Sequence, residues 1–268
     1  MKIRLLGTGG ADGIPALCAN SPVSDYARKH GGKDVRTRAA AVIDDELKID
    51  FGPDTLAQVQ RDNLDPRDWS ATIFTHSDED HLAVSEFQYF LFPFNTNEYL
   101  PFAIFGNAEV CRLIRQRYPE WPLEIHEISA FQPFQHTGYT ITPILANHKD
   151  DEEAHNFVIE RDGKKLIYAT DTGWWCDATF KFLTGGKADA LVVECTHGYN
   201  KNDYNGHLDI GECVGMVQRL RELDGLTDDA KVVTTHHSHQ GGARHCDLAR
   251  SLGRFAIEPG YDGMEFQI

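Results

Sequence analysis

The sequence predicts a fold of the α+β class, with strands outnumbering helices in a single domain that spans residues 1–268. Three observations support this prediction. Short apolar runs bounded by turn residues recur along the whole chain, as is typical of strands. Longer segments of helical composition interleave with these runs. Polar residues that could carry chemistry gather directly after several of the predicted strands.

The N-terminal third predicts a strand, a hairpin and a strand that leads into a polar loop. Lys2–Leu6 is the first strand and runs into a glycine-rich turn. Ala39–Ile43 and Leu47–Ile49 form the hairpin around three acidic residues. Ala71–Phe74 is the next strand, and Leu82–Leu91 beyond the polar loop has helical composition.

The remainder of the chain alternates strands with helices. The predicted strands are Ala103–Phe105, Leu123–Ile128, Tyr139–Leu145, Asn156–Ile159, Lys165–Ala169, Leu191–Val193, Lys231–Thr235, Phe255–Glu258 and Met264–Ile268. The predicted helices are Ala108–Arg117, Trp175–Leu183 and Ile210–Leu223. Ala19–Arg36 lacks clear periodicity, so we expect an irregular loop there.

Composition narrows the class of function. The chain has 26 Lys and Arg against 41 Asp and Glu, a formal net charge of −15, which disfavours tight non-specific binding to nucleic acid. No window approaches the ~18 apolar residues of a membrane span, and the N-terminus lacks a signal-peptide core. The six cysteines are scattered, which favours free thiols in a reducing compartment. We therefore expect a cytoplasmic protein.

The polar loop after Ala71–Phe74 concentrates potential metal ligands. His76, Asp78, Asp80 and His81 lie within six residues of one another. An acidic cap of the following helix is the alternative explanation, because the helix dipole favours carboxylates at that end. Capping accounts for one carboxylate but not for two histidines and three acids, so the cluster predicts a metal site.

Three further residues repeat this arrangement of a strand followed by a ligand. His148 follows Tyr139–Leu145, Asp171 follows Lys165–Ala169, and His236 follows Lys231–Thr235. Together with the polar loop they predict one composite site.

These residues in this order resemble the metallo-β-lactamase superfamily, whose two-metal hydrolases carry the motif H-x-H-x-D-H followed by His, Asp and His. The resemblance runs from Asp50 to His236. It implies an αββα four-layer sandwich and two bound divalent metal ions. The implied ligands are His76, Asp78 and His148 for the first ion, Asp80, His81 and His236 for the second, and Asp171 as the bridge. Asp50 would orient the ligand loop through hydrogen bonds, although a turn-forming aspartate explains it equally well.

Asp78 departs from the superfamily motif, which has a histidine at that position. A carboxylate is harder than an imidazole and carries a negative charge. The first site is therefore expected to favour Mn²⁺, or Fe²⁺, more than a site of three histidines would, with Zn²⁺ as the alternative.

The N-terminal third narrows the resemblance to one branch. Leu6–Pro15 and Arg36–Ala40 resemble the branch that contains the phosphoribosyl cyclic phosphate phosphodiesterase and the pyrroloquinoline-quinone biosynthesis B protein. That branch commonly has a three-cysteine zinc loop after the proline, but here residues 19–24 contain no cysteine. Cys18 with His239 cannot form a zinc site alone, so we predict no structural zinc.

The same branch suggests three further site residues. His207 matches the position of a general acid, a role that suits a side chain of pKa near 6.5, while the alternative is a solvated residue before a helix. Asp80, besides its expected role as a metal ligand, is predicted to be a catalytic residue together with His207. Arg36 and Arg38 are candidates for binding a substrate phosphate, although surface arginines are commoner than phosphate clamps.

The predicted function is a metal-dependent phosphodiesterase that acts on a small or cyclic phosphodiester through a hydroxide activated by two metals. The alternatives are a hydrolase of lactone or amide bonds at the same centre, and a non-hydrolytic biosynthesis protein of the same branch. A tRNA-processing ribonuclease is disfavoured by the acidic charge and by the lack of a basic arm. We expect a small-molecule substrate, no nucleic-acid or membrane partner, and a second copy of the chain as the candidate protein partner.

Overall fold

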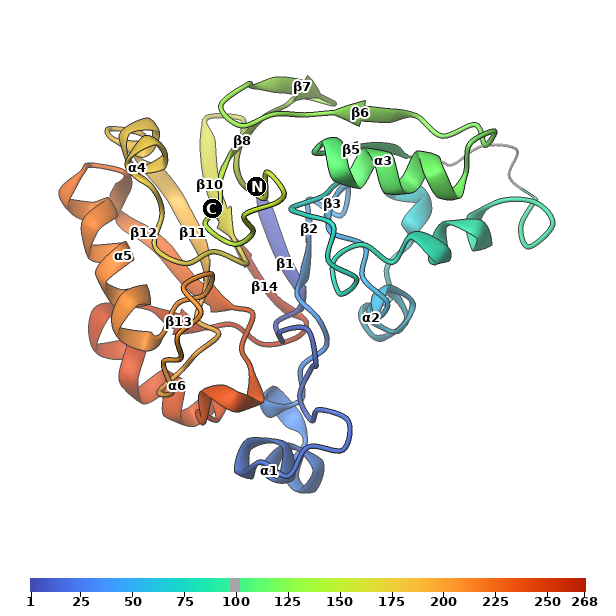
Figure 1. Cartoon of the computed structure of the whole chain (residues 1–268). Coiled ribbons are helices and arrows are strands. Elements are labelled where there is room, and N and C mark those ends of the chain that lie inside the picture. Colours follow the sequence, from blue (N-terminus) through green and yellow to red (C-terminus); the bar gives the residue numbers. More distant parts are fainter. Residues whose placement is uncertain (97–101) are drawn as a thin grey trace.

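The computed structural model describes residues 1–96 and 102–268, which form two seven-stranded sheets with helices on the outer side of each (Figure 1). This arrangement confirms the predicted αββα sandwich. Each sheet is half antiparallel and half parallel, so the two sheets repeat one pattern.

The first sheet has the order β14-β1-β2-β3-β4-β5-β6, antiparallel from β14 to β3 and parallel from β3 to β6. Its strands are β1 (Lys2–Gly7), β2 (Ala40–Ile43), β3 (Leu47–Ile49), β4 (Ala71–Ile73), β5 (Ala103–Gly106), β6 (Ile125–Glu127) and β14 (Met264–Gln267).

The second sheet has the order β13-β12-β11-β10-β9-β8-β7, antiparallel from β7 to β10 and parallel from β10 to β13. Its strands are β7 (Phe134–His136), β8 (Tyr139–Leu145), β9 (His155–Arg161), β10 (Lys164–Ala169), β11 (Ala188–Glu194), β12 (Leu226–Thr235) and β13 (Glu258–Pro259).

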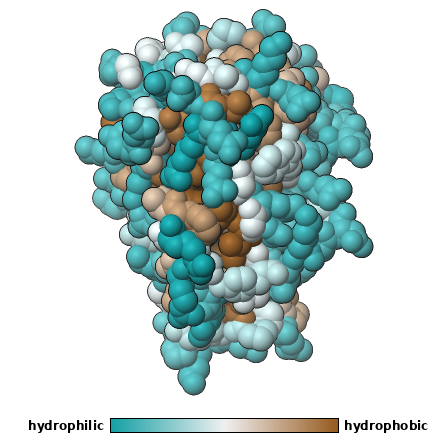
Figure 2. Space-filling model, turned by 90° about the vertical axis from the view of Figure 1, so that its left-hand side faces the viewer, coloured by the Kyte–Doolittle hydropathy of each residue, from teal (hydrophilic) through white to brown (hydrophobic). Residues whose placement is uncertain are grey.

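Helices cover the outer face of each sheet. They are α2 (Thr55–Asp62), α3 (Ala108–Arg117), α4 (Asp177–Leu183), α5 (Ile210–Glu222) and α6 (His245–Leu252). Helix α1 (Pro22–His30) lies apart from the two sheets and contacts the 3₁₀ helices at Gly32–Asp34 and His239–Gly241. In Figure 1, α4, α5 and α6 lie beside the second sheet, whereas α2 and α3 lie beside the first. Figure 2 shows the side that carries α4 to α6: hydrophilic residues cover most of it, with a narrow band of hydrophobic residues between them. Within the described residues, no helix has both the length and the apolar character needed to cross a membrane.

The alternation of side chains along the strands builds the layers. Ile3 and Leu5 of β1 join the hydrophobic cluster between the two sheets, while Leu6 joins the cluster under α3. Neighbouring side chains of a strand point to opposite faces, and a strand that is apolar on both faces is buried on both. The central strands are therefore fixed between two apolar layers, and their ends form a rigid platform for the loops.

Two of the predicted segments are wrong in type. The predicted loop at Ala19–Arg36 contains helix α1, whose cap is Ser21: its hydroxyl accepts a hydrogen bond from the amide of Ser24, and Pro22 starts the helix. This helix is short and buries only a few apolar residues, so its periodicity is weak. The predicted helix at Leu82–Leu91 is a 3₁₀ helix over Val84–Phe90.

Most of the other predicted elements are confirmed to within a few residues. Helix α3 has the predicted bounds, and the hairpin of β2 and β3 pairs Ala41 with Ile49. The sequence analysis missed α2, α6 and β7. It also overextended the strand at Phe255–Glu258, where only Glu258–Pro259 pairs.

Candidate metal centre

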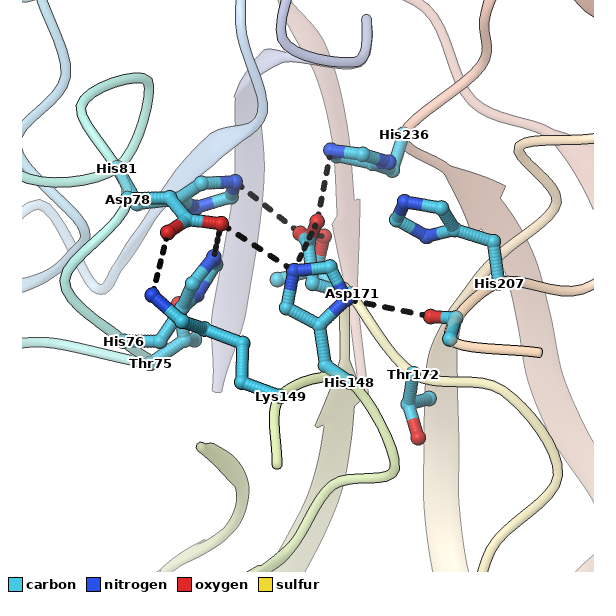
Figure 3. A network of polar contacts seen from close by, with 12 residues as sticks. Thr75, His76, Asp78, His81, His148, Lys149, Asp171, Thr172, His207 and His236 are labelled. Carbon is cyan, nitrogen blue, oxygen red and sulfur yellow. Dashed lines mark hydrogen bonds and ion pairs between the residues drawn. The ribbon is translucent and has the colours of Figure 1, made fainter. Parts of the chain in front are cut away.

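The predicted ligands come together at the ends of strands from both sheets. His76 and Asp78 follow β4 of the first sheet, whereas His148, Asp171 and His236 follow β8, β10 and β12 of the second (Figure 3). Because these loops leave the two sheets at neighbouring strand ends, residues up to 160 positions apart (His76 to His236) face one another.

Three of the site residues have an unusual backbone conformation. Asp50, Asp171 and His236 have φ values of 58°, 48° and 55°. The left-handed region is unfavourable for residues other than glycine, and it persists only where the surroundings impose it. In each case the chain turns sharply at the end of a strand, and the turn brings the side chain into the site.

The first group of ligands surrounds a position between His76 and His148. Their rings lie 4.8 Å apart between centroids, and donor atoms of His76, His148 and Asp171 lie within 4.8 Å of one another. Oδ2 of Asp78 lies 3.3 Å from Nε2 of His76 and 3.4 Å from Nε2 of His148. The nearby rings of His148 and His76 hold the pKa of Asp78 far below its usual range, with Lys149 adding to the effect.

The second group contains Asp80, His81 and His236, whose donor atoms also lie within 4.8 Å of one another. Nε2 of His81 lies 3.1 Å from Oδ2 of Asp80 and 3.1 Å from Oδ2 of Asp171. The other oxygen of Asp171, Oδ1, lies 3.1 Å from Nε2 of His236 and 3.8 Å from Nε2 of His148. Asp171 thus stands between the two groups.

The unpartnered nitrogens of this cluster indicate that it fits metal ions. Nε2 of His76, His81 and His236 is buried, and none of the three makes a hydrogen bond of acceptable geometry, although carboxylate oxygens lie nearby. A buried polar atom without a partner costs about 1–3 kcal/mol, so three in one place require an explanation. Nitrogen and carboxylate donors that converge on a common space are the ligand set of divalent transition metals.

The electrostatics of the cluster also favour a cation. Burial disfavours the charged form of His81, yet Asp171, Asp80 and Asp50 together raise the pKa of this ring well above its usual value. The surplus of carboxylates therefore attracts positive charge even into a buried position.

Asp50 lies behind the ligand loop and is fully buried. Its Oδ2 is 2.8 Å from Nδ1 of His81, and its Oδ1 accepts a hydrogen bond of 2.8 Å from the amide of Thr75. The hydroxyl of Thr75 in turn lies 2.9 Å from Nδ1 of His76. These bonds hold both rings with Nε2 toward the centre, which is the usual way that outer partners orient metal-binding histidines.

His207 has a buried carboxylate partner that the sequence analysis did not single out. Its Nδ1 lies 2.8 Å from Oε1 of Glu194, the last residue of β11. Burial lowers the pKa of His207, but the charge and hydrogen bond of Glu194 outweigh it and raise the pKa to about 9. The sequence did contain a signal for Glu194: it is an acidic residue directly after the apolar run Leu191–Val193, much as Asp171 follows a predicted strand.

Glu194 also links the second group to its surroundings. Its Oε2 accepts a hydrogen bond of 2.6 Å from the hydroxyl of Thr196, which lies 2.8 Å from Nδ1 of His236. The amides of Thr172 and Leu208 donate to the same carboxylate. One buried acid therefore orients both His207 and, through Thr196, His236.

The two arginines proposed for substrate binding do not line the cavity at the site. Arg36 is buried, and its guanidinium donates to the hydroxyl of Thr8 at 2.7 Å and to the carbonyl of Gly260 at 2.8 Å. Arg38 pairs with Asp54 at 3.0 Å. Both side chains thus join segments of the N-terminal region to the rest of the fold.

The region expected to lack a zinc loop contains Cys18 and faces His239. Cys18 is exposed, and the ring of His239 lies 2.7 Å from the carboxylate of Asp12 and 3.0 Å from the hydroxyl of Ser21. All six cysteines have free thiols. The absence of a third, sulfur-bound zinc stays a prediction.

A cavity of about 530 Å³ opens onto the centre. Most of the residues that line it are of polar types, and they come from both groups of ligands, from the Gly10–Asp12 turn and from the 196–207 and 236–241 loops. Tyr204 lies at its edge, and its hydroxyl is 3.2 Å from Nδ1 of His148.

The four layers and the buried histidine and aspartate cluster define the class of protein: a metallohydrolase of the metallo-β-lactamase fold. The chain belongs to the beta-lactamase superfamily domain family, whose family model matches residues 47–237.

Solved structures show the same fold over the whole chain. A diphosphatase of the PhnP family is 20% identical, with a TM-score of 0.79, over 100% of this chain and 97% of the other. Zn²⁺-bound PqqB from Methylobacterium extorquens is 17% identical, with a TM-score of 0.80, over 100% of both chains. The short form of human tRNase Z is 17% identical, with a TM-score of 0.69, over 100% of this chain and 99% of the other. No curated protein matches this chain in sequence.

Proposed function

We propose that this protein is a phosphodiesterase that hydrolyses a small or cyclic phosphodiester with the help of two divalent metal ions, Mn²⁺ or Zn²⁺. The observation that carries the proposal is the position of His207: its ring lies against that of His236, with centroids 5.2 Å apart, beside a cluster suited to two cations. The site thus combines a cation cluster with a proton donor.

The ions, when bound, would supply positive charge for the phosphoryl oxygens and lower the pKa of water. His76, Asp78 and His148 would hold the first ion and Asp80, His81 and His236 the second, with Asp171 between them. With this assignment, the oxygens of a phosphodiester would lie in the cavity that His207 lines.

His207 would donate the proton that the leaving oxygen needs. Its Nδ1–H bond to Glu194 leaves Nε2 as the atom that can face a substrate, and the buried carboxylate of Glu194 raises the pKa of the ring, which favours its protonated form. A protonated imidazole at hydrogen-bond distance is an effective general acid for a poor leaving group.

The size of the cavity supports a small substrate. A volume of about 530 Å³ lies in the range of small-molecule sites, about 300–1,000 Å³. The net charge of −15 disfavours a polynucleotide. The proximity of His207 to the cluster favours hydrolysis over a non-hydrolytic role, because it supplies a proton donor that a passive scaffold does not need.

The test is a comparison of substrate classes with protein that has been depleted of metal and reloaded separately with Mn²⁺ and Zn²⁺. Substrates are bis(4-nitrophenyl) phosphate, a 2′,3′-cyclic nucleotide, a ribose 1,2-cyclic phosphate, and a simple lactone. We expect turnover of one or more phosphodiesters that His207→Gln reduces by about 10²-fold or more. Turnover of the lactone alone would instead support the alternative function, a hydrolase of lactone or amide bonds. Turnover of none of these substrates would contradict the proposal.

A further inference from the structure

Lys149 directly follows His148 in the chain, and its ammonium group pairs with the residue that departs from the superfamily motif. Nζ of Lys149 lies 2.6 Å from Oδ1 of Asp78 (Figure 3). The other oxygen, Oδ2, faces Nε2 of His76 and Nε2 of His148 at 3.3 and 3.4 Å. The two oxygens of Asp78 thus have different partners, and only Oδ2 points to the ligand rings.

Glu152 holds the ammonium group in this position. Its Oε2 lies 3.0 Å from Nζ of Lys149, and its side chain is only 2% exposed. The same carboxylate accepts hydrogen bonds from the hydroxyl of Ser77 at 2.6 Å and from the amide of Asn107 at 2.7 Å. Because Glu152 is itself fixed from two sides, Lys149 is held against Asp78 rather than extended into solvent.

We propose that Lys149 is a positioning residue that sets the metal preference of the first site by making Asp78 resemble the histidine that it replaces. A neutral imidazole offers a metal one donor atom and no charge, whereas a free carboxylate offers two oxygens and a negative charge. With Oδ1 bound to an ammonium group, Asp78 presents one oxygen, and part of its charge is offset.

This pairing has a direct consequence for selectivity. Mn²⁺ prefers sites rich in carboxylate oxygen, whereas Zn²⁺ accepts nitrogen and oxygen donors alike. Lys149 therefore moves the first site toward Zn²⁺, relative to the same site with an unpaired Asp78. The inference rests on the metal centre of the proposed function but not on the choice of substrate.

The experiment compares the binding of Mn²⁺ and Zn²⁺ to wild type, Lys149→Met and Lys149→Arg, each depleted of metal beforehand. Free Mn²⁺ is measured by electron paramagnetic resonance, and Zn²⁺ by competition with a chromophoric chelator. In Lys149→Met we expect the affinity for Mn²⁺ to rise about tenfold or more relative to that for Zn²⁺, because the second oxygen of Asp78 becomes available and favours the ion that prefers carboxylate oxygen. Lys149→Arg should keep the wild-type ratio to within about threefold, since arginine retains the charge and pairs with carboxylates.

Lys165→Met is the matched control, because it removes a lysine paired with Glu160 at 3.0 Å, neither of which lines the cavity. It should leave the ratio unchanged. An unchanged ratio in Lys149→Met, or an equal loss of both affinities, would overturn the inference. If wild type binds neither ion, the inference and the proposed function both fail. If wild type binds metal but cleaves no phosphodiester, only the proposed function fails, and the ratio still decides the inference.

Discussion

Glu194 and His207, 13 positions apart in the chain, form a buried acid–imidazole pair in which Nδ1 lies 2.8 Å from Oε1. The pair lies beside the candidate metal centre: the ring of His207 stacks on that of His236. A buried carboxylate both fixes the tautomer of an imidazole and stabilises its charged form. The availability of a proton at His207 therefore depends on a residue that does not line the cavity.

Replacement of Glu194 by Gln should lower the pKa of His207 from about 9 toward its usual value near 6.5, because the anionic partner is lost. The titration of the ring can be followed by nuclear magnetic resonance in the metal-free protein. His207 should then lose its proton across neutral pH instead of above it. A pKa that stays near 9 would show that Glu194 does not control this ring.

Removal of the Asp171 carboxylate should release metal from both positions. Its Oδ2 lies 3.1 Å from Nε2 of His81, and its Oδ1 lies 3.1 Å from Nε2 of His236 and 3.8 Å from Nε2 of His148. Elemental analysis of Asp171→Ala after reconstitution should give well under one ion per chain, against two for wild type. Asp228→Ala, on the exposed part of β12, is the control. Retention of one full equivalent would show that Asp171 does not bridge.

Asp78→Ala should lose the first ion and keep the second, because the two ligand rings that its carboxylate contacts, His76 and His148, both belong to the first group. Asp78→His should restore the superfamily ligand set and move the preference of the first site from Mn²⁺ toward Zn²⁺. If Asp78 is merely a local cap, Asp78→Ala should instead cost about 1 kcal/mol of unfolding free energy and leave the metal content unchanged. Metal stoichiometry and unfolding midpoints of the three proteins distinguish these cases.

A third, sulfur-bound zinc should be absent, since the cysteines of the zinc loop are missing from residues 19–24. X-ray absorption of the Zn²⁺-loaded protein should show only nitrogen and oxygen neighbours. Zinc–sulfur scattering near about 2.3 Å would contradict this prediction.

Lys48 should make the stability of the protein depend on pH. It is fully buried, and burial lowers the pKa of its amine from 10.5 to about 7. Between pH 7 and 10.5 the unfolded chain therefore binds more protons than the folded one, so stability rises with pH in that window and is lower at its acid end.

Lys48→Met should remove this dependence. The unfolding free energy of wild type relative to Lys48→Met should rise by about 2 kcal/mol from pH 7 to pH 9, measured by urea denaturation. Lys29→Met, at an exposed position of α1, should show the wild-type slope. A constant difference between wild type and Lys48→Met across this range would show that the Lys48 amine stays charged when folded.

The sequence by itself determined the class of fold and the loops that carry the candidate metal ligands. Four candidate ligands each follow an apolar run: His76, His148, Asp171 and His236. Such runs become buried strands, and the ends of strands that pack in register lie close together. The hairpin of β2 and β3 and helix α3 were predictable for the same reason, since local pattern and burial agree there. Helix α1 was not predictable, because it buries too few apolar residues for a helical period to be recognised among its polar residues.

Only the tertiary structure decided which side chains support the ligands. Lys149 pairs with Asp78 across 71 positions, from a loop of the other sheet, and no local pattern marks such a pair. Arg36 looked available for a phosphate, yet its contact with Gly260, 224 positions away, buries it instead. Long charged side chains can reach partners in several directions. The sequence therefore gives the chemistry of such a side chain, but the packing of the two sheets determines which partner it contacts.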